Sequence, residues 1–297
     1  MPARVIVAGG ARDGQGRSTF VVNLAFSLLK ETRARVLVVD LDPRGGGDIA
    51  AMIGVPEART IVDFTPYLGQ LDAASFAPYI AAHPAGLGLL PLAADMEGAL
   101  KASPDAVRRA LDLLGSICDY VVVDAGSGCD PVNIVAMERA AGILLVTTAV
   151  PTALNAARAF ADRLQALHFP QQLVKFVVNA HDEALLSKEA VAARLGRSAL
   201  VVLPKDDKLS NEAINRAAPF VLDQPRATLS RHYDELTRQC VEKGIFDQLA
   251  AVARGKGQEV EKRRDVEVTQ EQEKALEGFL KARGGQRGKA SKELDPR

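Results

Sequence analysis

Short runs of apolar residues recur along the chain, and a longer stretch with apolar residues at helical spacing follows most of them. The runs are rich in valine, leucine and isoleucine and hold few polar residues. Strands of this kind are buried on both faces, as in a parallel sheet that helices cover. We predict strands at residues 4–8, 35–40, 86–92, 120–124, 142–148, 173–179 and 199–204.

The stretches that follow the apolar runs predict helices. They are residues 18–30, 103–115, 131–140, 151–167, 187–195, 207–216 and about 226–250. Repeated strand–helix alternation is typical of a doubly wound α/β domain, with a mostly parallel sheet and helices on both faces. Right-handed crossovers would bring the carboxyl ends of all the strands to one edge of the sheet, where ligands bind in such folds.

The composition changes near residue 255. Residues 251–297 are dense in charges of both signs and poor in apolar residues. Such a segment cannot bury enough apolar surface to fold alone, although EQEKALEGFLKAR could form one short helix. We therefore predict a globular domain at 1–250 and a charged, largely disordered extension at 251–297.

Charge and cysteine usage narrow the class of protein. Lys plus Arg and Asp plus Glu both total 37, so the net charge is zero, which disfavours non-specific nucleic-acid binding. The three cysteines are far apart and lack metal-ligand spacing, as is typical of reduced thiols. The N-terminal sequence has no signal-peptide pattern, and no run is long and apolar enough to span a membrane. We expect a cytoplasmic protein.

A glycine-rich segment, GGARDGQGRST at residues 9–19, joins the first predicted strand to the first predicted helix. Backbone N–H groups of such a loop, with those at the helix start, attract phosphate oxygens. Gly14 and Gly16 would let the backbone come close, Arg17 would reach the phosphates, and the Ser18 hydroxyl could ligate Mg²⁺. A plain turn between strand and helix is the alternative. The residues predicted to bind nucleotide here are Gly14, Gln15, Gly16, Arg17, Ser18 and Thr19.

Carboxylates end two of the other predicted strands. Asp40 and Asp42 lie in RVLVVDLDPRGG, and Asp124 ends the apolar run YVVVD. A carboxylate that points at bound phosphates can orient Mg²⁺ or the attacking water. An uncompensated charge at Asp124 would be costly after so apolar a strand, and a magnesium ion would compensate it. A simple turn at the end of the strand in RVLVVDLDPRGG is the alternative, because Asp, Pro and Gly all favour turns.

These motifs, taken in order, resemble those of the MinD/ParA family of P-loop ATPases, of the SIMIBI type. The family's deviant loop reads K-G-G-x-G-K-[ST]; here both lysines are arginines, Arg12 and Arg17, and Asp13 replaces the first glycine. The resemblance covers about residues 3–243. It implies a homodimer around two ATP molecules, with Arg12 reaching the partner's phosphates and Arg17 binding phosphate within its own subunit.

The resemblance also assigns roles to the carboxylates. It implies that Asp42 positions the attacking water and that Ser18, Asp40 and Asp124 hold Mg²⁺. The predicted catalytic residues are thus Asp42, Arg12 and Arg17. The family usually has the sequence D-x-P where YVVVD ends, whereas in this chain Ala125 and Gly126 follow Asp124.

Two further strand ends correspond to the family's base-binding side. Asn179 ends FVVN and Pro204 ends VVLP, and the resemblance places these residues beside the adenine. The guanine-reading N-K-x-D signature is absent, because Ala-His-Asp follows Asn179, and this favours ATP over GTP. The alternative for Asn179 is a simple cap at a strand end.

The family resemblance, strongest to its TadZ/CpaE pilus-localisation and FlhG branches, implies an ATP-dependent dimer switch with slow ATP hydrolysis. Such a switch would position or help to assemble a surface machine, a pilus or secretion apparatus. Two alternatives stay open: a scaffold that binds nucleotide weakly or not at all and acts by protein–protein interaction, and a regulator of flagellar placement or number.

The expected partners are a second copy of the chain and a protein of a polar or surface machine, engaged in part through the charged tail. Residues 245–257 and the segment KALEGFLKAR carry small apolar faces beside basic residues. They leave open a peripheral membrane contact, with recruitment to a cell pole or the inner membrane surface.

Overall fold

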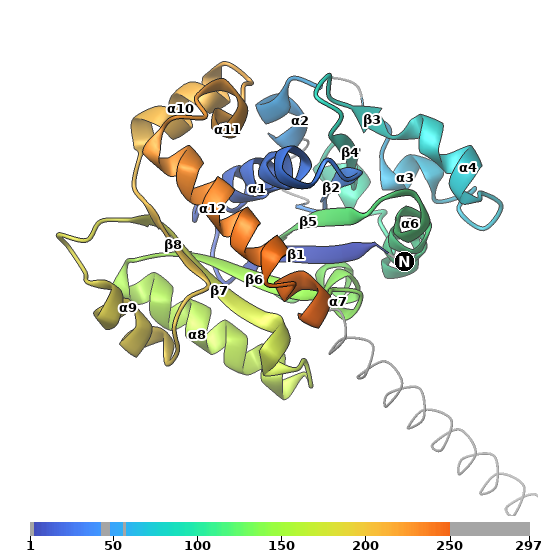
Figure 1. Cartoon of the computed structure of the whole chain (residues 1–297). Coiled ribbons are helices and arrows are strands. Elements are labelled where there is room, and N and C mark those ends of the chain that lie inside the picture. Colours follow the sequence, from blue (N-terminus) through green and yellow to red (C-terminus); the bar gives the residue numbers. More distant parts are fainter. Residues whose placement is uncertain (1–2, 43–47, 56–57, 250–297) are drawn as a thin grey trace, which may run out of the picture. The chain divides into compact units, whose positions relative to one another are not determined.

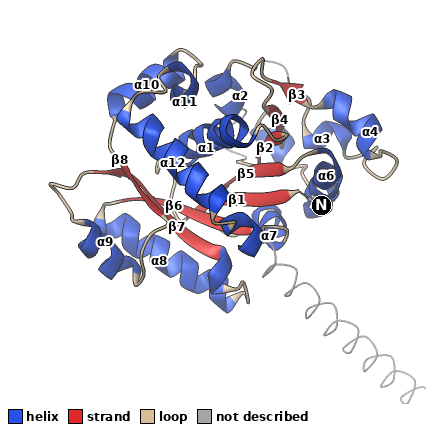
Figure 2. Ribbon diagram, viewed as in Figure 1, coloured by secondary structure: helices blue, strands red, loops and turns tan. Residues whose placement is uncertain are grey.

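The computed structural model describes residues 3–42, 48–55 and 58–249. Its strands form one sheet in the order β3-β4-β2-β5-β1-β6-β7-β8, parallel except for β3 (Figures 1 and 2). The strands are β1 (Arg4–Gly10), β2 (Val36–Asp40), β3 (Ala81–Ala82), β4 (Gly88–Pro91), β5 (Tyr120–Ser127), β6 (Gly142–Thr148), β7 (Val174–His181) and β8 (Val201–Pro204).

Helices connect the parallel strands. The α-helices are α1 (Arg17–Thr32), α2 (Asp48–Ile53), α3 (Ile61–Phe64), α4 (Ala73–Phe76), α5 (Met96–Ala99), α6 (Pro104–Ile117), α7 (Pro131–Glu138), α8 (Pro151–Ala166), α9 (Lys188–Leu195), α10 (Asp207–Asn215), α11 (Phe220–Asp223) and α12 (Thr228–Glu242). Two short 3-10 turns are η1 (Ala77–Tyr79) and η2 (Gln171–Leu173). Polar caps start several of these helices: Ser103 accepts from the N–H of Ala106, and Asp206 from that of Leu209.

Each face of the sheet carries its own hydrophobic core. One face packs against α1, α2, α10, α11 and α12, where Tyr233 of α12 lies between Phe20 and Phe220. The other packs against α3, α4, α6, α7, α8 and α9. Alternate residues of β1 divide between the two cores, Ile6 on one side and Val5 and Val7 on the other. The predicted doubly wound α/β fold is confirmed.

The structure departs from the predicted elements in several places: the short helices α5 and α11 were not predicted, and β5 continues to Ser127. Between β2 and β4 it has the two-residue antiparallel strand β3 and the short helices α2, α3 and α4, which lack a long apolar period. At the other end, α12 stops at Glu242 and not near 250, because Gly244 adopts a left-handed φ of 58°.

Some predictions fall outside the described residues: the charged extension at 251–297, Pro43 after Asp42, residues 250–257 of the first membrane-contact candidate, and the whole of the second, KALEGFLKAR. Within the described part, no helix is both long and apolar enough to cross a membrane.

Candidate functional site

The glycine-rich loop lies between β1 and α1, at the edge of the sheet where the parallel strands end (Figure 1). Gly14 and Gly16 have φ of 70° and 73°, which glycine adopts without strain. Gly16 caps α1 without a side-chain hydrogen bond, and the first turn of α1 has no acidic residue. The first N–H groups of α1 therefore have no side chain that competes with an anion for them.

Gln15 fastens this loop to the far strands of the sheet. Its side-chain oxygen accepts from the N–H of Thr148 at 3.0 Å and from the Thr148 hydroxyl at 2.9 Å, at the end of β6. Its backbone carbonyl accepts from the Asn179 side-chain amide at 3.0 Å, at β7. A side chain on Gly16 would overlap that same amide. Loop and strand ends thus fit closely, and Asn179 contacts the loop in this state.

Arg17 bridges two of the predicted carboxylates. Its Nε donates to Asp124, and one of its terminal nitrogens donates to Asp42. The arginine side chain is 7% exposed and that of Asp124 is 0% exposed, with Asp42 at 14%. Such deep burial of charge is tolerated when the partners are paired and hydrogen-bonded. The compensating charge that Asp124 requires is thus supplied by the guanidinium of Arg17.

Ser18 and Asp40 complete the cluster. The Ser18 hydroxyl donates to the second oxygen of Asp124 at 2.6 Å. Asp40 and Asp124 are register partners on the adjacent strands β2 and β5, and Asp40 accepts from the N–H of Asp42 at 3.1 Å. Burial, and then the charge of Asp124, raises the pKa of Asp40 to about 7. Near pH 7 the Asp40 carboxyl is thus only about half ionised, and a cation nearby would favour its ionised form.

The loop borders a pocket of about 390 Å³, lined by residues 13–19 with Asp42 and Asp48. Burial and the nearby charge of Asp42 raise the pKa of Asp48. The glycine geometry, the free start of α1 and the oxygen donors of Ser18 and Asp124 fit a nucleotide with its magnesium ion. Three aspartates line the pocket, so the fit is better for a metal complex than for a free triphosphate.

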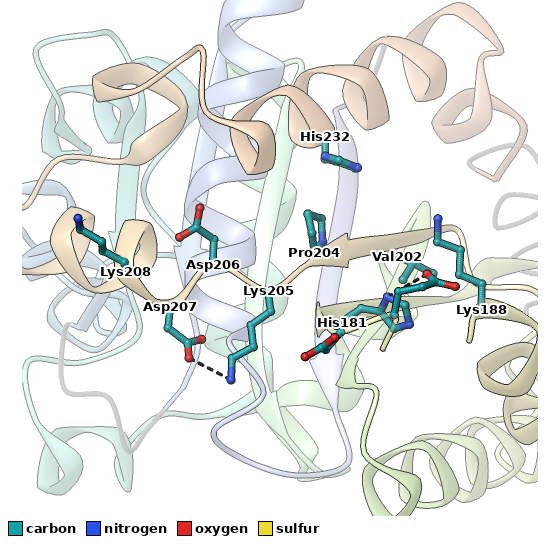
Figure 3. Close-up of a pocket in the computed structure, with 11 residues that line it drawn as sticks. His181, Lys188, Val202, Pro204, Lys205, Asp206, Asp207, Lys208 and His232 are labelled. Atoms are coloured by element: carbon teal, nitrogen blue, oxygen red, sulfur yellow. Dashed lines mark ion pairs between the residues drawn. The ribbon is translucent and has the colours of Figure 1, made fainter. Parts of the chain in front are cut away.

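A second pocket, of about 650 Å³, opens beyond Asn179 at the ends of β7 and β8. Figure 3 shows Pro204 at its centre, with the Lys205–Asp207 ion pair to one side and His181 to the other. His181 is held by the carbonyl of Leu186, 2.7 Å from its Nε2. Pro204 thus lines a cavity on the side of the sheet where the sequence predicted the base.

The structure brings most of the predicted site residues to one edge. Arg17, Ser18, Asp42 and Asp124 are in direct contact, Asp40 lies beside Asp124, and Asn179 touches the loop. Arg12 instead is exposed at the rim. In the part of the chain that the structure describes, no three His, Cys, Asp or Glu side chains group closely enough to hold a metal ion. The carboxylates are arranged around the arginine.

Sequence reasoning missed the attachment of Gln15 to Thr148 and the place of Asp48 in the pocket. The only signal for the attachment of Gln15 was a weak one, a long polar side chain within a glycine-rich loop. For the second there was no signal, since Asp48 begins the 6-residue helix α2, which is too short to show a usable period.

The chain was also compared with known proteins. No family model matches it. It is 26% identical over 246 residues to the antiactivator FleN of Pseudomonas aeruginosa, which covers 82% of the chain and 78% of FleN. It is 26% identical over 149 residues to an uncharacterised protein of Pseudomonas putida, and this match spans 55% of that protein's length.

Solved structures share the fold. A ParA family ATPase of Chlorobium tepidum superposes with a TM-score of 0.74 at 22% identity, over 79% of this chain and 98% of that one. The septum site-determining protein MinD of Pyrococcus horikoshii, complexed with Mg-ADP, superposes with a TM-score of 0.69 at 21% identity, over 84% and 98%. The resemblance is confirmed at the level of the fold: the chain has the fold of the ParA/MinD ATPases.

Proposed function

We propose that the chain is a nucleotide-dependent dimer switch of the ParA/MinD type that hydrolyses ATP slowly and acts on a protein partner. The observation that carries the proposal is the convergence of the glycine loop, Ser18 and the three carboxylates at one sheet edge. Bound ATP would supply the phosphoanhydride that is cleaved to ADP and phosphate.

The chain's own groups would act as follows. The N–H groups at the start of α1 and Arg17 hold phosphate charge, and Ser18 with Asp40 and Asp124 holds Mg²⁺. Asp42 orients the attacking water, which requires that it first part from Arg17. Arg12, exposed on the rim, is free to reach across a dimer. Asn179 and Pro204 flank the base.

The partner machine is the finer part of the proposal. A pilus or secretion apparatus is the role that the motifs implied, and placement or number of flagella is the alternative. The similarity to the antiactivator FleN is consistent with the flagellar alternative and with a switch that works by binding another protein.

A second candidate is a scaffold with little or no turnover. The pairing of Arg17 favours the scaffold, because the cationic side chain that should bind phosphate is already paired with two carboxylates. Asp13, Asp42 and Asp48 also line the pocket and oppose a free triphosphate.

One experiment separates these candidates. ATP binding, phosphate release and light-scattering mass are measured for the wild type, Arg17→Ala and Asp42→Ala. The switch predicts that ATP binds, that dimer mass rises with ATP, and that Asp42→Ala lowers turnover but not binding. Binding without turnover above that of Asp42→Ala would refute the hydrolysis cycle. No nucleotide binding at all would leave the scaffold, and a dimer indifferent to ATP would rule out the switch.

A further inference from the structure

We propose that Arg17 is the resident cation of the magnesium site, so that a divalent ion and the Arg17–Asp124 pair exclude each other. Metal and nucleotide then load only together, because the nucleotide's phosphates must give Arg17 new partners. The coupling to nucleotide rests on the proposed function, whereas the exclusion of metal by Arg17 does not.

The geometry of the bridge is specific to arginine. The guanidinium reaches Asp124, within β5, through Nε, and Asp42, just beyond β2, through a terminal nitrogen. A planar fork can serve two carboxylates from different strands at once, whereas an ammonium is a single point charge. The arginine therefore pairs with both carboxylates in a fixed planar geometry that the rotating ammonium of a lysine would not impose.

The same oxygens are the ones a divalent cation needs. Ser18 and Asp124 already face each other at 2.6 Å, and Asp40 lies on the neighbouring strand in register with Asp124. Carboxylate and hydroxyl oxygens are the donors that Mg²⁺ and Mn²⁺ prefer. A metal ion at Asp124 would stand where the guanidinium now donates, and two cations cannot share that buried position.

Charge balance makes the exchange obligatory. Asp124 is fully buried, and a buried carboxylate without a partner is strongly unfavourable. Asp124 must therefore keep either Arg17 or a metal ion. A metal ion without nucleotide would leave the charge of Arg17, whose side chain is 7% exposed, without its partner Asp124. Free Mg²⁺ should bind the wild type poorly, and so should a triphosphate without metal, which meets the aspartates of the pocket.

The test uses Mn²⁺ as the probe, on the full chain without nucleotide, with binding read by electron paramagnetic resonance and by the melting temperature. We expect Arg17→Met to bind Mn²⁺ about tenfold or more tightly than the wild type and to be stabilised by it. Arg12→Met is the matched control: it removes the same charge from the same loop at an exposed position and should behave like the wild type. Adding Asp124→Asn to Arg17→Met should abolish the gain.

Equal Mn²⁺ affinity in the wild type and Arg17→Met would overturn the proposal, as would a gain that survives Asp124→Asn. If Arg17→Met does not fold, Arg17→Gln decides, because a neutral amide removes the cation from Asp124 and keeps a hydrogen-bond donor: it should bind Mn²⁺ more tightly than the wild type, and no gain would refute the exchange. A wild type that binds no ATP would defeat the proposed function and leave this Mn²⁺ result standing.

Discussion

The contact between Gly16 and Asn179 gives a sharp test of how the loop is held. Gly16→Ala places a methyl group against the Asn179 amide and forces a left-handed φ on alanine. Gly14→Ala has nearly the same φ, but nothing lies within 4 Å of its added carbon. The pair therefore separates backbone strain from the steric overlap.

The magnitudes follow from these two contributions. A left-handed φ costs alanine about 1–2 kcal/mol, less about 0.4–1 kcal/mol for the stiffer unfolded chain, so Gly14→Ala should lose about 1 kcal/mol. Gly16→Ala must also displace Asn179 from the Gln15 carbonyl, which adds about 1 kcal/mol for the hydrogen bond. We expect Gly16→Ala to lose about 2 kcal/mol in total.

Urea unfolding of the two variants, alone and combined with Asn179→Ala, measures these losses. With Asn179 removed, the cost of Gly16→Ala should fall to that of Gly14→Ala, because the overlap is gone. Equal costs for the two glycine variants in the wild-type background would refute the reasoning, and so would an undiminished Gly16→Ala cost in the Asn179→Ala background.

Three further outcomes are expected. The pKa of Asp40 is raised to about 7, so the free energy of unfolding that this group contributes below about pH 4 is lost as the pH rises toward 7. Asp40→Asn should therefore stabilise the protein by at most about 4 kcal/mol at about pH 8, and by much less at about pH 4. Urea unfolding at both pH values checks this. Gln15→Met should lose about 1–2 kcal/mol and speed hydrogen exchange at the amide of Thr148, which keeps its rate if the loop is held otherwise. Burial raises the pKa of Cys118 to about 11, so a thiol reagent at about pH 8 should modify Cys129 well before Cys118, and equal rates would contradict the packing.

The fold was predictable because the parallel strands are continuous apolar runs. The segments at 4–8, 142–148 and 173–179 became β1, β6 and β7 with shifts of a residue or two. The region between β2 and β4 was not predicted, since its helices are short and rely on local caps. Thr60 and Asp72 each close a capping box there, a T-x-x-D and a D-x-x-S pattern that period counting passes over.

That the candidate residues lie close together was predictable, whereas their pairing was not. Asp40, Asp42 and Asp124 lie at or near the carboxyl ends of β2 and β5, and parallel topology brings those ends together. The partner of Arg17 could not be predicted, because the choice between phosphate and carboxylate depends on charges from two other strands. The same holds for Asn179, whose amide reaches the loop carbonyl only because β7 ends beside it.

The loop's two attachments lie on opposite halves of the sheet. Gln15 is fastened to β6 and β7, and two residues later Arg17 is fastened to Asp124 of β5 and to Asp42, just beyond β2. Residues 15–17 thus tie the two halves of the sheet edge together through one short stretch of backbone, whose middle residue, Gly16, has no side chain.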